Sequence, residues 1–202
     1  MPNLNAAFEK NLEQWGESQT CRELTRNLRE LLKSGAVSKR IKKIVGFGLG
    51  SLDVLEYGHL AVRSHAQHAA MKTLARILNE RPMGSQLAAG SKCNRTSENA
   101  TTKTTDGKGI KCYAQDPGYG DVDLELLRSI DIEPLDDPKG FLEIDDETLV
   151  LSVSPNIPVK QIVADVQWPG AMIWNTVSAD ERKARWEKRV WDGLETWVMY
   201  VS

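Results

Sequence analysis

Hydrophobic residues recur with helical spacing in two segments near the start of the chain, residues 4–15 and 20–33. We expect each segment to form a helix that buries one face. Thr20 stands where an N-cap of the second helix would be, and Gly35 follows where a helix commonly ends. The pattern therefore predicts a helical extension over residues 1–38.

Short runs of almost wholly apolar residues alternate with helical patterns along the rest of the chain. The runs that predict strands are residues 44–47, 109–115, 132–135, 148–154, 171–174 and 195–201. The patterns that predict helices are residues 52–80, 121–130, 159–166 and 179–192. Strands without a polar face are typical of a parallel sheet that helices cover on both sides. We therefore predict a three-layer, Rossmann-like α/β domain with a mostly parallel sheet in residues 39–202.

Residues 83–107 interrupt this alternation. They are dominated by Gly, Ser, Thr, Asn and Lys and contain almost no large apolar side chain. A segment of this composition buries too little apolar surface to hold one conformation, so we predict a mobile loop. The length of 202 residues otherwise favours one compact domain over two.

The charge balance argues against some classes of partner. The chain has 26 Lys and Arg against 28 Asp and Glu, a net charge of -2, which gives no global case for nucleic-acid binding. Basic residues gather between Arg22 and Lys43, which favours a solvated surface over a phosphate-facing patch. No apolar run reaches the roughly 18 residues of a membrane span, and no signal-peptide pattern is present. We expect a cytoplasmic or nuclear protein without a membrane partner.

Neither the cysteines nor the histidines have the spacing of a metal site. The cysteines are Cys21, Cys93 and Cys112. They are odd in number and lack C-x-x-C spacing, so neither a disulfide framework nor a zinc site is expected. The histidines are His59, His65 and His68. They share one predicted helix without a Cys partner, which favours solvated or hydrogen-bonded positions over metal ligation.

The first predicted strand runs into a glycine-rich turn with the sequence Gly46-Phe-Gly48-Leu-Gly50-Ser51. Ligands of open α/β sheets bind at the carboxyl ends of the strands, where glycines let a ligand approach the backbone. The sequence is neither the full G-x-G-x-x-G fingerprint nor a P-loop, which would carry a lysine. It predicts a ligand-facing turn, with the hydroxyl of Ser51 at its end, and identifies no cofactor. The alternative is that the glycines only allow tight packing.

Polar residues follow the other predicted strands. Asp116 ends the second strand, where Rossmann-like folds hold ribose hydroxyls, although residues 116–120, which include Tyr119, also suit an ordinary turn. Ser154 and Asn156 follow the fourth strand, and Asn175 ends the fifth. These small polar groups suit binding better than acid–base catalysis. A triad of Ser51, a histidine and Asp116 would lack the G-x-S-x-G elbow.

The order of these segments resembles the Sensitivity-to-Red-Light-Reduced domain family, in its fungal type. The matching features are residues 44–51, Gln67 in an alanine-rich helix, residues 113–117, residues 147–151 before a proline loop, and Trp174-Asn175. The resemblance covers about residues 40–177 and adds Gln67 to the candidate ligand-binding residues. Where the family would have a Pro-His-Cys-like step, this chain has Ser154-Pro155-Asn156.

The resemblance implies a regulatory or sensing role, since relatives are associated with light signalling, clock-controlled transcription and haem-linked regulation. Under this first hypothesis a nucleotide-like or other small ligand binds over residues 46–51 and Asp116, and a protein partner recognises the ligand-bound state. The second hypothesis is a transferase, either of adenosyl-methionine type or an aminoacyl-tRNA-dependent cyclodipeptide synthase with Ser51 as acyl acceptor. The synthase would need tRNA on the basic face. The lack of an evident general base beside Ser51 favours the first hypothesis.

Overall fold

A computed structural model describes residues 4–37, 41–53, 59–80, 109–153, 155–175 and 197–201. Its centre is a sheet in the order β3-β2-β1-β4-β5-β6. The strands are β1 (Lys43–Phe47), β2 (Lys111–Gln115), β3 (Glu133–Pro134), β4 (Thr148–Ser152), β5 (Ala171–Asn175) and β6 (Trp197–Val201). The first five strands are parallel and β6 runs antiparallel to β5. This topology confirms the predicted Rossmann-like fold with a mostly parallel sheet.

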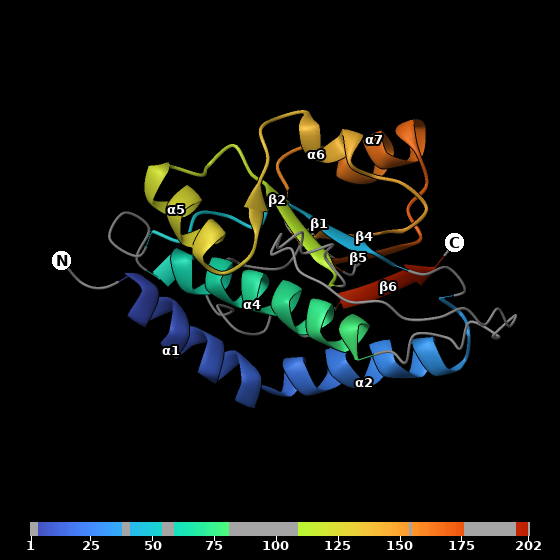
Figure 1. Cartoon of the computed structure of the whole chain (residues 1–202), viewed down its shortest axis with the longest axis horizontal. Helices are drawn as coiled ribbons and strands as arrows, with labels where there is room; N and C mark the ends of the chain where they lie inside the picture. The colour runs from blue at the N-terminus through green and yellow to red at the C-terminus, as the bar shows by residue number, and fades with distance from the viewer. Residues whose placement is uncertain are drawn as a thin grey trace, which may run out of the picture.

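Helices cover both faces of this sheet (Figure 1). On one side lie α1 (Leu4–Glu17), α2 (Gln19–Lys33), α4 (His59–Asn79) and α5 (Asp121–Ser129), and on the other lie α6 (Lys139–Leu142) and α7 (Val159–Val166). The two N-terminal helices pack against α4, which separates them from most of the sheet. In the part of the chain that is described, no helix combines the length and apolar character needed to cross a membrane.

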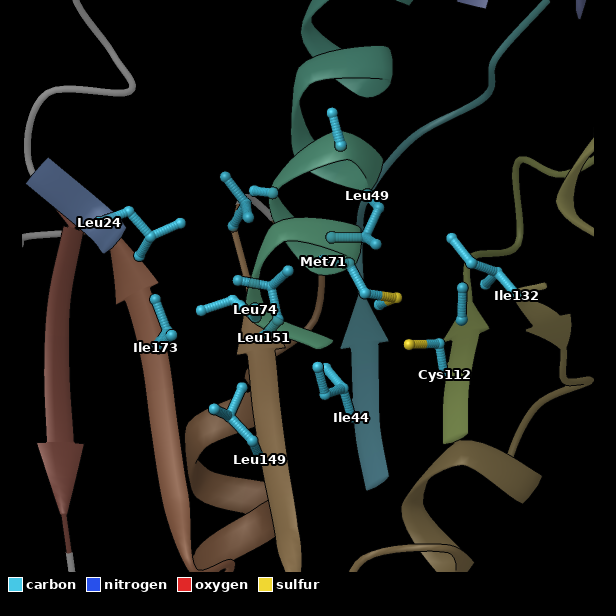
Figure 2. Close-up of a cluster of buried hydrophobic side chains, with 14 of the residues drawn as sticks. Leu24, Ile44, Leu49, Met71, Leu74, Cys112, Ile132, Leu149, Leu151 and Ile173 are labelled. Atoms are coloured by element: carbon cyan, nitrogen blue, oxygen red, sulfur yellow. The ribbon is translucent and has the colours of Figure 1, made fainter. Parts of the chain in front are cut away.

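The larger core lies between α4 and the sheet. Figure 2 shows side chains of α4, the strands and α2 meeting there, among them Leu24, Ile44, Met71, Leu74, Leu149, Leu151 and Ile173. Small residues of α4, such as Ala69 and Ala70, are fully buried and let the helix lie close to its neighbours. On the opposite face Phe47 stacks on Phe141 of α6, with ring centroids 4.5 Å apart.

Some predicted boundaries are wrong. The N-cap of α2 is Ser18, not Thr20, because the hydroxyl oxygen of Ser18 accepts the N–H of Cys21 at 3.0 Å. The helix predicted from residue 52 is described only from His59, and residues 51–53 are not helical. Gly35 lies directly beyond the end of α2 with a left-handed φ of 71°, as expected for a residue that stops a helix.

The sequence pattern also missed one element, the short helix α6, because a single turn carries no periodic signal. The predicted loop at 83–107 and the predicted helix at 179–192 lie outside the described residues.

Candidate functional site

The glycine-rich turn after β1 and the acidic turn after β2 meet at the carboxyl edge of the sheet. The carboxylate of Asp116 accepts the N–H of Gly50 at 2.7 Å on one oxygen and the N–H of Gly118 at 2.8 Å on the other. Gly50 has a φ of 76°, a left-handed conformation that favours glycine. The sequence analysis predicted that these two segments share an edge, and they do, since β1 and β2 are parallel neighbours in the sheet. It did not predict that they are directly hydrogen bonded.

A cavity of about 310 Å³ opens beside this junction, and we call it the turn cavity. Its walls come from the carboxyl ends of three strands and from Ser64 of α4. The strand ends contribute Phe47, Gly48, Gly50 and Ser51 at β1, residues 115–118 at β2, and residues 155–157 with Val159 beyond β4. Since β1 pairs with both β2 and β4, the chain order reverses there, and this is where open α/β sheets bind ligands. Its volume lies at the low end of the usual range for small-molecule pockets, about 300–1,000 Å³.

The glycines of the turn differ in what surrounds them. Gly48 has a φ of 68°, and a Cβ built there would lie 2.7 Å from the Cα of Pro155, which also lines the turn cavity. A Cβ on Gly50 would collide with the hydroxyl of Ser64. Gly46 faces α4 instead, where a Cβ would lie 2.5 Å from Met71 Cε, and it would also lie 2.6 Å from Leu49 Cδ1 of the turn. Tight packing therefore accounts for Gly46, whereas Gly48 and Gly50 also line the turn cavity.

Asp123 organises the end of the turn, and the sequence analysis did not single it out. Its side chain is 2% exposed, and its carboxylate accepts the N–H of Leu52 at 2.6 Å, the N–H of Gly120 at 2.8 Å and the hydroxyl of Ser51 at 3.0 Å. The available signal was an acidic residue in the first turn of the helix predicted at 121–130. That signal indicates helix capping and says nothing of a partner 72 residues away in the chain.

Two buried histidines of α4 support the same region. His68 donates from Nδ1 to the carbonyl of Ser64 at 2.7 Å and accepts the Tyr119 hydroxyl at Nε2, 2.8 Å away. His65 donates from Nε2 to the carbonyl of Leu52 at 2.9 Å. Burial lowers the pKa of His68 to about 4 and also lowers the pKa of His65, while burial raises the pKa of Tyr119 well above its ordinary value. His65, His68 and Tyr119 are therefore uncharged near neutral pH and take part in a buried hydrogen-bond network.

The other predicted site residues have different surroundings. Asn156 lines the turn cavity, whereas Gln67 is 5% exposed within α4. Ser154 and the side chain of Asn175 lie outside what the structure describes. Gln115 was not predicted as a site residue. It lines the turn cavity, and its side-chain oxygen accepts the N–H of Gly140 at 2.6 Å. The available signal was a polar residue at the end of an apolar strand.

The basic residues of α2 lie elsewhere. Arg22, Arg26, Arg29 and Lys33 line a separate hollow of about 440 Å³, together with Arg76 of α4. Arg29 and Arg76 both pair with Glu80 at 2.8 Å and 2.7 Å. Among the described residues, this hollow shares no lining residue with the turn cavity. Within the same residues, no group of three His, Cys, Asp or Glu side chains could hold a metal ion.

Comparisons with known proteins add one match. A family model described as the SRR1 domain matches residues 24–196, which include every element of the site. No curated protein and no solved structure matches the chain.

Proposed function

The chain belongs to the SRR1 domain family, and from that premise we propose that it is a cytoplasmic or nuclear protein that binds a small ligand in the turn cavity. Membership of the family supports a regulatory or sensing role at the level of the family. The observation that supports ligand binding is the position of the turn cavity at the point where the strand order reverses. A protein partner would then respond to the occupied state.

The composition of the walls also supports binding. Pro117, Pro155 and Ile157 contribute accessible apolar surface, while the Asp116 carboxylate and the Ser51 hydroxyl contribute polar groups. Small-molecule sites typically combine a largely apolar lining with a few placed polar groups. Since Asp116 is itself held by two backbone N–H groups, its orientation is fixed before a ligand arrives.

Gly48→Ala tests the proposed binding. The new Cβ would push against Pro155 and reshape the turn cavity, so we expect the ligand-induced rise in melting temperature to disappear. The panel for this thermal-shift measurement comprises nucleosides, nucleotides, amino acids and S-adenosyl-methionine. We also expect a loss of about 2 kcal/mol in the free energy of unfolding, from left-handed strain and crowding.

Gly35→Ala is the matched control. Gly35 has a similar left-handed φ of 71°, but a Cβ there would meet nothing within 4 Å. We expect it to carry only the conformational cost, about 1 kcal/mol, and to keep every thermal shift of the wild type. Shifts that are equal in Gly48→Ala and wild type would contradict the proposal, and so would a panel in which no compound stabilises the wild type.

The transferase hypothesis has one specific observation in its favour, since Ser51 does have a carboxylate beside it. However, the Asp123 carboxylate also accepts two backbone N–H groups, so both of its oxygens already serve as acceptors that hold the turn. The basic hollow on α2 is also separate from Ser51, whereas a bound tRNA would have to reach both. We therefore assign Ser51 a structural role in the turn.

Ser51→Ala tests whether Ser51 has a structural role or acts as an acyl acceptor. It removes the hydrogen bond to Asp123 and the acceptor of the Asp53 N–H, 3.1 Å away, so we expect a loss of about 1–2 kcal/mol in unfolding free energy. Because Ser51 also lines the turn cavity, ligand-induced stabilisation should be reduced but not abolished. Ser129→Ala, which removes a single hydroxyl bond to a carbonyl outside the turn cavity, should cost less. An acyl adduct on Ser51 in peptide mass spectra of the wild type would instead support the transferase.

A further inference from the structure

The glycine-rich turn uses most of its backbone N–H groups within the protein. Gly48 donates its N–H to the carbonyl of Gln115, and Gly50 donates to Asp116 Oδ2. Leu52 donates to Asp123 Oδ1, and Asp53 donates to Ser51 Oγ. A phosphate site needs several N–H groups that converge on an empty position. Here two carboxylates accept N–H groups of the turn that a phosphate-binding turn would leave free for its ligand.

The charge of the site also disfavours a phosphate ligand. Among the described residues that line the turn cavity, Asp116 is the one charged side chain. Within the described part of the chain, neither Asp116 nor Asp123 forms an ion pair with Lys or Arg. The first N–H of α7, at Val159, is donated to the carbonyl of Ile157 at 2.8 Å. An incoming phosphate would therefore meet a negative carboxylate, and no described residue of the lining supplies a compensating cation.

The same carboxylate is well suited to a ligand that donates hydrogen bonds. An ionised carboxylate has about four acceptor positions, and Asp116 uses one on each oxygen for Gly50 and Gly118. The remaining positions can accept O–H or N–H groups, as acidic residues at this place in Rossmann-like folds do with ribose hydroxyls. Pro117, Pro155 and Ile157, which are exposed or half-buried, provide an apolar surface for a flat ring.

We infer that the turn cavity binds an unphosphorylated nucleoside-type ligand, neutral or cationic, and discriminates against the corresponding phosphate. The juxtaposition that carries this inference is the Asp116 carboxylate hydrogen bonded into the glycine-rich turn, beside a cavity whose described lining has no cation. The inference rests on the proposed function and specifies the class of ligand for the same site.

Isothermal titration of the full chain with matched pairs tests this inference. The probes are adenosine, guanosine, cytidine and uridine, each against its 5′-monophosphate in buffer without divalent cations. We expect at least one nucleoside to bind at least about tenfold more tightly than its monophosphate, because one carboxylate near a phosphate costs that much or more. Asp116→Asn should reduce this ratio to about threefold or less, whereas Asp121→Asn, an exposed acid of α5, should leave it unchanged.

Each outcome decides the inference. A monophosphate that binds as tightly as its nucleoside would overturn it, as would an unchanged ratio in Asp116→Asn. If none of the four nucleosides binds, the nucleoside class is wrong. The proposed function fails separately: a phosphorylated ligand that requires Gly48 would overturn this inference alone, whereas a panel with no Gly48-dependent ligand would overturn both.

Discussion

Asp123→Asn should lower the free energy of unfolding by about 4 kcal/mol. The carboxylate of Asp123 accepts two backbone N–H groups and one hydroxyl, and an asparagine presents an oxygen to only part of this set. Each buried donor left without an acceptor costs about 1–3 kcal/mol. The amide NH₂ would in addition face at least one of these donors. Urea unfolding followed by circular dichroism measures the effect.

Asp121→Asn provides the matched comparison for Asp123→Asn. Asp121 lies in the same first helical turn of α5 but is exposed, so its carboxylate contributes mainly through the helix dipole. That contribution is about 0.5 kcal/mol. Equal losses in the two variants would show that Asp123 stabilises the protein only as a helix-end charge, and the network linking it to residues 51 and 52 would then carry no stability.

The second large effect is a loss of stability as the pH falls from 6.5 to about 4. Burial lowers the pKa of His68 to about 4 from an ordinary 6.5, so the folded protein keeps this ring neutral while the unfolded chain protonates it. Above pH 6.5 the ring is neutral in both states and His68 adds no pH dependence. Below pH 6.5 the unfolded state is favoured, by about 3 kcal/mol in total when the pH reaches the folded pKa.

His68→Gln isolates the contribution of this ring. The glutamine cannot titrate, so the plot of unfolding free energy against pH should be less steep between pH 6.5 and 4 than in the wild type. His65 remains in the variant and its lowered pKa keeps part of the slope. Denaturant unfolding at a series of pH values measures both curves. Identical slopes would mean that His68 has the same pKa in the folded and the unfolded state, which would contradict the lowered pKa.

The pattern of apolar residues was sufficient to predict the fold class. β1 and β4 are buried on both faces along nearly their whole length. Such strands appear in the sequence as uninterrupted apolar runs, which are typical of a parallel sheet covered on both sides. α7 was predicted at its observed bounds because its apolar positions repeat regularly between two breaks in the pattern, at Pro158 and Gln167. Errors occurred where a single hydrogen bond decides a boundary, as at the N-cap of α2.

The candidate site was predictable only in part. The rule that parallel strands place their carboxyl ends at one edge brought Gly48, Gly50 and Asp116 together correctly. Asp123 could not be found in this way, because its partners are backbone groups of residues far away in the chain, and any acidic residue at a helix start has the same local signal. The sequence also could not show that the Asp116 carboxylate accepts the backbone N–H of Gly50 within the turn.

The edge of the sheet at β3 has a consequence for self-association. β3 consists of only Glu133 and Pro134, and proline has no N–H to offer a neighbouring strand. Exposed sheet edges are templates for strand addition and aggregation unless they are short, charged or interrupted by proline. This edge meets all three conditions, so fibril growth or dimerisation by continuation of the sheet is disfavoured on this side of the molecule.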